Sequence, residues 1–474
     1  MPRRPASKRS EPHAPLHVVI LAAGQGTRMK SAIPKVLHVL GGRTLVAHVL
    51  DTAQALGAEA CHVVLGHGAE TVRAWFAAAR PGDESVVFVH QAQQLGTGHA
   101  VQQAMPNIPD NANVLVLYGD VPLIERETLS ELVEANGKGL AILTARVADP
   151  TGYGRIVRDK SGAVKAIVEH KDASSAQLRI GEINTGVMAA PARKLRDWLA
   201  RVGNRNAKHE YYLTDCVALA VKDRASVKAV VAESSEEVLG VNDRVQLAQQ
   251  ERTWQRRQAE GMMKSGVGIR DPARFDLRGT LLCGTDVTID VGVIIEGEVH
   301  LGDHVTIGPH TVLRNVRIGA GTHVEAHCVL DSAEIGRACR IGPFARIRPE
   351  SRLGDQVHIG NFVELKKSSL ADGSKANHLA YVGDATVGSR VNIGAGVITC
   401  NYDGANKHRT IIGDDAFIGT DTQLIAPVTI GEGAYIAAGS SISMDAPARQ
   451  LTICRARDQR SLPGWKRPKK AGTS

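Results

Sequence analysis

Two different periods of apolar residues divide this chain into regions of different architecture. Between residues 16 and 242, short apolar runs alternate with stretches that have helical spacing. The runs predict strands at His17–Leu21, Cys61–Leu65, Val86–Val89, Val114–Leu117 and Ala141–Ala145. The stretches between them, such as 44–55 and 98–105, predict helices. This alternation is typical of a Rossmann-like α/β domain, in which helices cover both faces of a mostly parallel sheet.

A period of six begins further along the chain. From Leu282 onward, aliphatic residues recur at every sixth position and are often followed by glycine; the longest series are Ile335, Ile341, Ile347, Leu353, Ile359, Leu365 and Ile412, Ile418, Leu424, Ile430, Ile436, Ile442. This repeat predicts a parallel β-helix in which each six-residue side buries one aliphatic side chain. Three sides complete a coil, so we expect about eight to ten coils. Proteins with this pattern resemble left-handed β-helix acyltransferases, which are usually trimers.

Two breaks interrupt the repeat. There are 22 residues from Leu365 to Val387 and 13 from Thr399 to Ile412. Each break predicts residues that loop away from the solenoid, and such insertions often line the binding face of a repeat protein. The first contains Lys366, Lys367, Lys375, Asn377, His378 and Tyr381, and the second contains Asn401, Tyr402, Asp403, Asn406, Lys407 and His408.

A polar stretch rich in Gln and Arg separates the two regions. It predicts a long exposed helix that acts as a connecting arm, with Val245, Leu247, Ala248, Trp254 and Met262 as its main apolar positions. We therefore expect five parts: a basic extension (1–15), an α/β domain (16–242), a helical arm (243–265), a β-helix domain (266–454) and a basic tail (455–474).

Composition narrows the functional classes. The 474 residues carry a net charge of +8, but the first 14 hold +3 and the last 20 hold +6, which leaves the body near neutral. We therefore expect no specific nucleic-acid partner. The seven cysteines form no C-x-x-C pair, which favours reduced thiols and a cytoplasmic protein. No run of about 20 apolar residues predicts membrane insertion, and the short apolar stretch near the N-terminus runs straight into a glycine loop, so we do not expect export.

That glycine loop, LAAGQGTRMKSAIPK over residues 21–35, is the most informative motif. Glycines tolerate positive φ and let backbone N–H groups approach phosphate oxygens, while Arg28 and Lys35 add two cations. The loop predicts a triphosphate site, and it resembles the signature of sugar-1-phosphate nucleotidyltransferases. Asp120 follows another predicted strand, so it is expected at the same edge of the sheet.

The two halves together resemble one bacterial family, the bifunctional N-acetylglucosamine-1-phosphate uridyltransferases and glucosamine-1-phosphate acetyltransferases. The resemblance covers residues 16 to about 466 and includes LAAGQGTRMKSAIPKVLH, QLGTGHA, LYGDVPL, EINTG, GVNDR, IGNFVELKKS and NIGAGVITCNYDGANKH. It implies that the N-terminal domain joins UTP to N-acetylglucosamine 1-phosphate, and that the C-terminal domain moves acetyl from acetyl-CoA to glucosamine 1-phosphate. It further implies a cytoplasmic homotrimer that makes a precursor of peptidoglycan and lipopolysaccharide.

For uridylyl transfer, the resemblance implies that Asp120 and Asn242 hold Mg²⁺, an ion that keeps waters and takes phosphate oxygens as its other ligands. Arg28 and Lys35 would be catalytic by neutralising the triphosphate. The implied contacts are Leu21, Ala22, Ala23, Gly24, Lys35, Tyr118, Gly119, Asp120 and Asn242 for the nucleotide and its phosphates, Gln91, Gly96 and Thr97 for uracil, and Gly154, Glu169 and Asn184 for the sugar.

For acetyl transfer, the resemblance implies His378 as the general base, because histidine titrates near neutral pH. Glu364 is the expected carboxylate that orients it. The implied contacts are Arg348, Lys366, Tyr381 and Asn392 for the sugar phosphate and Ala395, Asn401, Tyr402, Thr420, Ala438 and Arg455 for acetyl-CoA. Thr420 stands where relatives are expected to have serine, and its additional methyl group could narrow the slot for the pantetheine arm.

Two other interpretations fit parts of the chain. The first is a single-function nucleotidyltransferase whose β-helix serves assembly or regulation, as in ADP-glucose and mannose-1-phosphate enzymes. Lys366, His378 and Tyr381 argue against it, because a purely structural solenoid does not need them. The second is a scaffold or a nucleic-acid-binding solenoid that uses the basic tails, and the near-neutral body argues against that interpretation.

Overall fold

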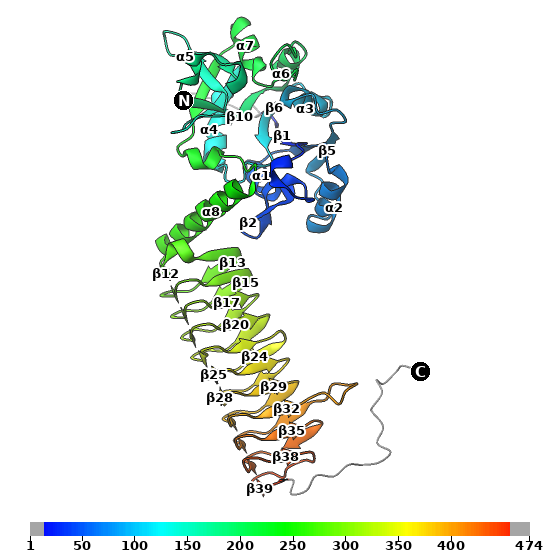
Figure 1. The fold of residues 1–474 in the computed structure, drawn as a ribbon, viewed down its shortest axis with the longest axis vertical. Coiled ribbons are helices and arrows are strands. Elements are labelled where there is room, and N and C mark those ends of the chain that lie inside the picture. Colours follow the sequence, from blue (N-terminus) through cyan, green and yellow to red (C-terminus); the bar gives the residue numbers. More distant parts are fainter. Residues whose placement is uncertain (1–13, 456–474) are drawn as a thin grey trace, which may run out of the picture. The chain divides into compact units, whose positions relative to one another are not determined.

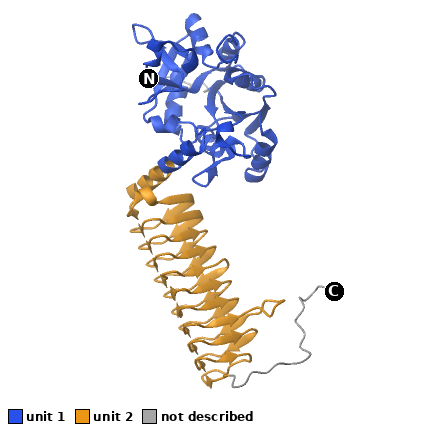
Figure 2. Ribbon diagram, viewed as in Figure 1, with its two compact units in different colours: residues 1–253 blue, residues 254–474 orange. Residues whose placement is uncertain are grey.

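A computed structural model describes residues 14–455. The chain divides into two compact units, residues 1–253 and 254–474 (Figure 2). The predicted basic extension and basic tail lie outside the described residues, apart from Ala14, Pro15 and Arg455.

The first unit is built on a nine-stranded sheet whose main path runs β11-β7-β10-β6-β1-β4-β5 (Figure 1). Pairings along this path are parallel except those of β10 with β6 and β7. The strands are β1 (Leu16–Ala22), β4 (Ala60–Leu65), β5 (Val86–His90), β6 (Asn113–Tyr118), β7 (Leu140–Arg146), β10 (Glu182–Pro191) and β11 (Val227–Val231), with β8 (Arg155–Arg158) and β9 (Val164–Val168) attached to β10 and β2 (Val39–Leu40) and β3 (Arg43–Thr44) as a separate pair. The five predicted strands and the mostly parallel sheet are confirmed.

Helices cover both faces of this sheet. They are α1 (Leu45–Ala55), α2 (Ala69–Ala79), α3 (Thr97–Ala104), α4 (Arg126–Asn136), α5 (Ser175–Leu178), α6 (Ala192–Leu199) and α7 (Asp215–Lys222), with 3-10 turns η1 (Thr27–Met29), η2 (Lys35–Leu37), η3 (Met105–Asn107), η4 (His170–Asp172) and η5 (Ser235–Val238). Val18 and Ile20 of β1 face one core cluster, and Val19 between them faces the other. Side chains alternate across a strand, so a strand with two buried faces needs a continuous apolar run.

Two neighbouring histidines lie inside this sheet. His17 of β1 and His62 of β4 are buried, with Nδ1 of the first 3.0 Å from Nε2 of the second. Burial lowers the pKa of both rings, that of His62 to about 4, with His17 adding to the effect. The folded protein therefore keeps His62 neutral, whereas the unfolded chain takes up a proton as the pH falls below about 6.5.

Acid should therefore destabilise the first unit. The free energy of unfolding is expected to fall between the unfolded pKa of about 6.5 and the folded value, by up to about 3 kcal/mol for His62. His62→Gln cannot titrate, so its melting temperature should change less than that of the wild type between about pH 7 and about pH 5. His90→Gln, at an exposed histidine of β5, is the control. Equal pH dependence in His62→Gln and the wild type would contradict the prediction.

The predicted arm is helix α8 (Arg244–Lys264), and the boundary between the units falls within it. Its buried positions are Gln250, Gln255 and Ala259, none of which is among the predicted apolar positions. The Gln255 side chain accepts from the backbone N–H of Leu277 at 2.7 Å and donates to its carbonyl at 2.9 Å. The predicted long helix is therefore present and exposed or half-buried at its other positions, and a buried amide that the pattern did not indicate joins α8 to the first strands of the β-helix.

The second unit is a parallel β-helix (Figure 1). One sheet has eleven strands, one for each coil: β12 (Gly268–Ile269), β14 (Thr288–Ile289), β16 (Thr306–Ile307), β19 (His323–Val324), β22 (Arg340–Ile341), β25 (His358–Asn361), β28 (Lys375–His378), β31 (Asn392–Ile393), β34 (Phe417–Ile418), β37 (Tyr435–Ile436) and β39 (Leu451–Thr452). The last of these strands, β39, begins a coil that the described residues do not complete, so ten complete coils are present, as the prediction of about eight to ten expected. The repeat begins before Leu282, which is itself 52% exposed, and the earlier signal was a second series of buried residues, Phe275, Leu281, Val287, Val293, Val299 and Val305.

The remaining strands form a seventeen-stranded sheet around the same core. They are β13 (Asp276–Cys283), β15 (Ile294–Leu301), β17 (Val312–Arg314), β18 (Arg317–Ile318), β20 (Val329–Asp331), β21 (Ala333–Ile335), β23 (Arg346–Ile347), β24 (Ser351–Leu353), β26 (Glu364–Lys366), β27 (Ser369–Leu370), β29 (Tyr381–Gly383), β30 (Ala385–Val387), β32 (Ile398–Cys400), β33 (Thr410–Ile412), β35 (Gln423–Ile425), β36 (Val428–Ile430) and β38 (Ser441–Ile442), with the turn η6 (Pro272–Arg274) before β13.

The first predicted break was wrong. Leu370, Ala376 and Val382 are buried and continue the column between Leu365 and Val387, so the coil runs on through β27, β28 and β29. The six-residue period fails between Leu365 and Val387 because two of the four sides there contain five residues instead of six.

The second predicted break is confirmed. Asn392 of β31 pairs with Phe417 of β34, 25 residues later, whereas His323 pairs with Arg340 after 17 residues. The added residues project as a loop between β32 and β33 (Figure 1), in which Tyr402 and Lys407 form an antiparallel bridge.

Candidate active sites

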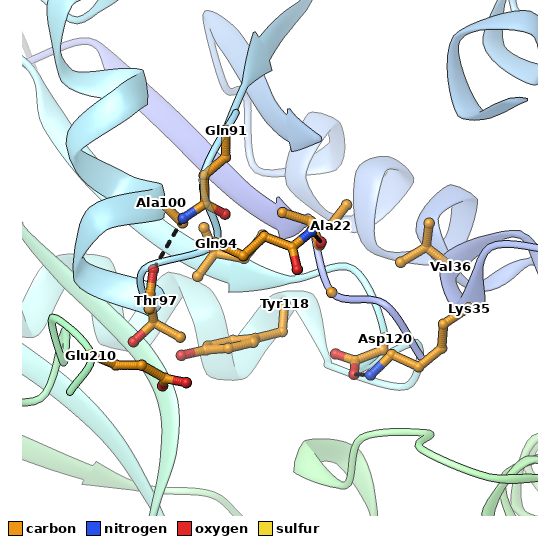
Figure 3. Close-up of a pocket in the computed structure, with 14 residues that line it drawn as sticks. Ala22, Lys35, Val36, Gln91, Gln94, Thr97, Ala100, Tyr118, Asp120 and Glu210 are labelled. Atoms are coloured by element: carbon orange, nitrogen blue, oxygen red, sulfur yellow. Dashed lines mark hydrogen bonds and ion pairs between the residues drawn. The ribbon is translucent and has the colours of Figure 1, made fainter. Parts of the chain in front are cut away.

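A cavity of about 290 Å³ lies beside the carboxyl ends of β1 and β6 (Figure 3). It is lined by Leu21, Ala22, Ala23, Gly24, Lys35, Val36, Gln91, Gln94, Gly96, Thr97, Ala100, Tyr118, Asp120 and Glu210. The sequence predicted ten of these residues. Val36, Gln94, Ala100 and Glu210 were missed, although Gln94 lies inside the recognised string QLGTGHA.

A cation and two oxygen ligands meet at one end of this cavity. Lys35 forms an ion pair with Asp120 (Figure 3). Its Nζ also lies 3.3 Å from Asn242 Oδ1. Lys35 belongs to η2, Asp120 follows β6, and Asn242 precedes α8, so three distant segments converge here. The carboxylate and amide oxygens already share one positive charge, which fits the oxygen ligands that Mg²⁺ prefers.

The backbone of the glycine loop packs closely against Lys35. Gly26 has a φ of +62°, and a Cβ atom there would lie 2.8 Å from the Cβ of Lys35. A side chain at residue 26 would therefore displace the lysine. Arg28, in η1, is exposed and does not line the cavity, so its predicted role in neutralising the triphosphate rests on the resemblance alone.

The opposite end of the cavity is held by local hydrogen bonds. Gln91 is buried, and its Nε2 donates to the carbonyl of Gly96 at 3.2 Å. Gly96 has a φ of +111°, and a Cβ atom there would lie 2.7 Å from the carbonyl oxygen of Tyr211. Gln94 Nε2 donates to the carbonyl of Ala23 at 2.8 Å, which joins this end to the glycine loop. These contacts leave a fixed, narrow slot.

The three predicted sugar contacts lie together. The Asn184 backbone N–H donates to the carbonyl of Gly154 at 2.8 Å, and a Cβ atom on Gly154 would lie 3.5 Å from Glu169 Oε1. Thr214 donates to Glu169 at 3.2 Å, and burial raises the pKa of Glu169. Asn184 Oδ1 is buried and has no hydrogen-bond partner within the described residues. It is therefore available to accept a hydrogen bond from a ligand.

Tyr118 connects this sugar cluster to the metal end. Burial raises the pKa of its hydroxyl, and the carboxylates of Glu169 and Asp120 add to the shift, so both lie within electrostatic reach of the ring. Gly119 beside it donates its N–H to the carbonyl of Leu21, which fixes the end of β6 against the start of the glycine loop.

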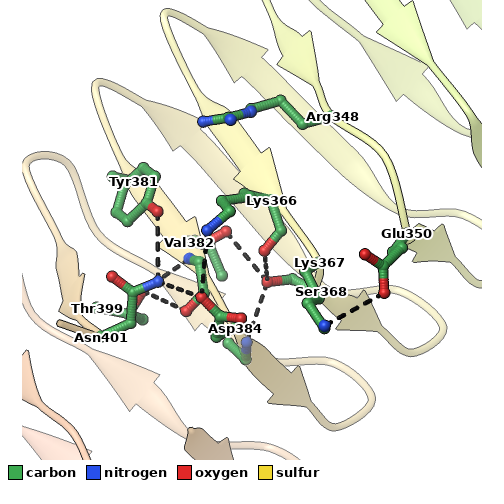
Figure 4. A network of polar contacts seen from close by, with 12 residues as sticks. Arg348, Glu350, Lys366, Lys367, Ser368, Tyr381, Val382, Asp384, Thr399 and Asn401 are labelled. Carbon is green, nitrogen blue, oxygen red and sulfur yellow. Dashed lines mark hydrogen bonds and ion pairs between the residues drawn. The ribbon is translucent and has the colours of Figure 1, made fainter. Parts of the chain in front are cut away.

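The second unit carries a polar network on β26, β29 and the turn that follows it (Figure 4). Lys366 Nζ lies 3.6 Å from Asp384 Oδ2, and Asn401 Nδ2 hydrogen-bonds to the same oxygen. Asn401 Nδ2 also lies 3.4 Å from the Tyr381 hydroxyl. Two predicted residues, Lys366 and Asn401, therefore meet at Asp384, which the sequence analysis did not name, and Tyr381 joins the network through Asn401. Its register directly after Gly383, the partner of Lys366 in the next coil, was the available signal.

His378 lies at the end of β28, in the eleven-stranded sheet, and is exposed. Its Nδ1 is 2.9 Å from Asn361 Oδ1, one coil earlier. Glu364 belongs to the other sheet and accepts from Arg348 Nη1 at 2.8 Å. No hydrogen bond within residues 14–455 joins Glu364 to His378. Within one chain, therefore, Asn361 contacts the histidine, and the role of Glu364 as the carboxylate that orients it stays a prediction.

Four of the predicted acetyl-CoA contacts form a column below His378. The backbone N–H groups of Gly396, Asp421 and Gly439 donate to the carbonyls of His378, Ala395 and Thr420, so these positions lie in successive coils; Arg455 Nη2 then reaches the carbonyl of Ala438, one coil further, at 2.9 Å.

The other predicted residues lie around this column. Tyr402 is exposed on the projecting loop, with Lys407 Nζ 4.2 Å above its ring. Asn392, on β31, pairs with Lys375 in the sheet of His378 and is not part of the network around Asp384.

Protein-family models match both units. Residues 18–179 match a MobA-like NTP transferase domain, residues 277–361 a GMPPB C-terminal domain, and residues 409–443 a bacterial transferase hexapeptide of six repeats. The match to the HddC structure from Yersinia pseudotuberculosis covers 50% of this chain and 99% of that chain, at 21% identity and with a TM-score of 0.38.

Relatives match almost the whole chain. The bifunctional protein GlmU of Alkalilimnicola ehrlichii is 58% identical over 453 residues, which is 96% of both chains, and that of Bordetella parapertussis is 56% identical over 96% of this chain and 99% of its own. This chain belongs to the GlmU family. Membership confirms the predicted α/β nucleotidyltransferase joined to a left-handed β-helix, and with it the predicted pair of transferase activities.

Within the described residues, no helix is both long and apolar enough to cross a membrane.

Proposed function

We propose that the cavity of the first unit joins UTP to N-acetylglucosamine 1-phosphate, and that the column below His378 in the second unit acetylates glucosamine 1-phosphate. The observation that carries the first assignment is the convergence of Lys35, Asp120 and Asn242 beside a narrow slot. The observation that carries the second is the alignment of His378 with the predicted acetyl-CoA contacts.

In the first site, Asp120 and Asn242 would hold Mg²⁺, because a carboxylate oxygen and an amide oxygen meet at the end of the cavity and suit the oxygen ligands that this ion takes. The bound ion would offset the negative charge of the triphosphate. A phosphate oxygen of the sugar attacks the α-phosphorus, and pyrophosphate leaves. Lys35 adds positive charge where that charge builds up, so the residues act by positioning and neutralisation.

The sugar cluster of Gly154, Glu169 and Asn184, which lies outside the lining of the cavity, favours the acetylated substrate. Asn184 Oδ1, a buried acceptor without a partner in the described chain, suits the acetamido N–H. The ammonium group of the unacetylated sugar would have to lose its water at the same place, which costs more than transferring a neutral amide. Acetyl transfer therefore precedes uridylyl transfer.

In the second site, His378 acts as the base. A proton on Nδ1 is donated to Asn361 Oδ1, which leaves the Nε2 lone pair free. The neutral amine nitrogen of the sugar attacks the acetyl carbonyl, and His378 takes the amine proton. The C–S bond then breaks, and His378 returns that proton to the departing sulfur, so CoA leaves as the thiol. Arg348 and Lys366 bind the sugar phosphate, a role that suits two cations.

We further propose that the enzyme is a homotrimer in the cytoplasm. An exposed ladder of rings, His310, His327, Phe344 and Phe362, runs along one corner of the β-helix towards Leu379, beside His378. Exposed apolar surface of this kind is characteristic of an interface, and a second copy would cover it and complete the site at His378. Sedimentation equilibrium measures the number of copies directly.

One experiment tests the proposed function and its order. Wild-type protein is supplied with UTP, Mg²⁺ and either sugar phosphate, and pyrophosphate is measured; CoA release is followed separately with acetyl-CoA and glucosamine 1-phosphate. We expect kcat/KM for uridylyl transfer to be at least about tenfold higher with the acetylated sugar. Similar values for the two sugars would refute the order. Absence of CoA release would make the β-helix a scaffold and leave a single-function enzyme.

A further inference from the structure

We infer that Asp384 is a positioning residue for acetyl transfer, which holds the sugar-phosphate contact Lys366 and the acetyl-CoA contact Asn401 on a single carboxylate. The inference rests on the proposed function of the second unit. It adds a residue whose side chain links the two substrate-binding groups and contacts neither substrate.

The backbone of Asp384 is fixed from both sides. It lies between β29 and β30 with a φ of +50°, its N–H donates to the carbonyl of Lys366 at 2.9 Å, and its carbonyl accepts from Thr410 at 3.2 Å. Aspartate is one of the few residues with a side chain that tolerates this conformation. The carboxylate therefore has little freedom to follow a neighbour that moves.

The carboxylate is largely shielded from solvent and receives two partners on one oxygen. Its side chain is 14% exposed, and Oδ2 receives both Lys366 Nζ and Asn401 Nδ2 (Figure 4). Asn401 is itself buried and reaches the Tyr381 hydroxyl. A hydrogen bond to an ionised acceptor is about twice as strong as a neutral one, so Asp384 sets the distance between the lysine and the asparagine.

A second aspartate at a coil corner provides a comparison for the contacts of Asp384. Asp415 also has a positive φ, +56°, and binds Arg390 through two contacts of 2.7 Å. Both of its partner atoms belong to an exposed arginine that is outside the predicted sites. An ion pair at a coil corner is therefore not in itself a sign of a binding site, whereas the carboxylate of Asp384 joins two residues predicted to contact substrates.

Two substitutions separate the two contacts. Asp384→Asn keeps an acceptor oxygen for Asn401 but removes the charge that holds Lys366. Its KM for glucosamine 1-phosphate is expected to rise about tenfold, with the KM for acetyl-CoA within about twofold of the wild type. Asp384→Gly suits the positive φ and removes both contacts, so both KM values should rise. A purely structural role would not raise the two KM values separately.

The experiment measures acetyl transfer with the full chain, varying each substrate in turn, alongside uridylyl transfer and the melting temperature. Asp415→Asn is the matched control and should behave as the wild type. Unchanged KM values in Asp384→Asn, or equal changes in both, would overturn the inference while the proposed function stands. A wild type without acetyl transfer would overturn both.

Discussion

Asp120→Asn is expected to lower uridylyl transfer by about 100-fold or more while acetyl transfer continues at the wild-type rate. The substitution keeps the shape of the side chain and removes its charge. Two groups lose their partner as a result: the cation that Asp120 and Asn242 would hold, and Lys35, whose ion pair with Asp120 fixes its position at the end of the cavity. Both losses weaken neutralisation of the departing pyrophosphate.

The measurement is pyrophosphate release from UTP and N-acetylglucosamine 1-phosphate over a range of Mg²⁺ concentrations. If Asp120 is a metal ligand, the Mg²⁺ concentration required for half of the remaining rate should rise as well. Asp149→Asn, at an exposed aspartate on the loop before β8, keeps its local contact to Thr151 and is the control. Wild-type rates in Asp120→Asn would exclude a metal-binding role for that carboxylate.

The nucleotide cavity was predictable because its parts follow strands. The glycine loop and Asp120 each follow a parallel strand, and the carboxyl ends of parallel strands meet at one edge of a sheet. Asn242 lies far along the chain and follows no such rule, so it came from the resemblance. Gln94 and Glu210 were missed because a lining position depends on the direction of a side chain, which a loop sequence does not specify.

The β-helix was predictable from its six-residue period, and the prediction failed where a side of the coil has five residues instead of six. A coil of 17 residues instead of 18 shortens one side by one residue, and the apolar column continues through Leu370 and Ala376. A small residue such as Ala376 fills its position in the core, but it does not belong to a pattern of large aliphatic residues at every sixth position. The insertion at residues 401–408 was predictable because it lengthens the coil by more residues than a corner of the β-helix can contain.

Side-chain partners across coils could not be predicted, because they depend on the exact length of every side. A change of one residue moves a side chain to another face. The sequence therefore placed Glu364 beside His378, whereas within one chain the coils bring Asn361 to the histidine and Arg348 to the glutamate. Asp384 was missed for the same reason, since its partners Lys366 and Asn401 lie in the coils before and after it.

His378→Ala should show the reverse of Asp120→Asn. We expect it to lower acetyl transfer by about 10²- to 10⁴-fold, the range for removal of a general base, and to leave uridylyl transfer unchanged. The residue is exposed at the end of β28, and its ring makes one hydrogen bond, to Asn361, so its loss leaves the buried column of the coil intact. His323→Ala, on the same sheet at β19, is the control for removing an imidazole from this face.

Mixing the two variants then tests whether the sites are independent. Neither variant alone should convert glucosamine 1-phosphate into the nucleotide sugar, because each lacks one step. Together they should restore the conversion, since the acetylated sugar phosphate released by Asp120→Asn is the substrate that His378→Ala still uses. Failure to complement, with each single activity intact, would mean that the intermediate must pass between sites of one assembly without entering solution.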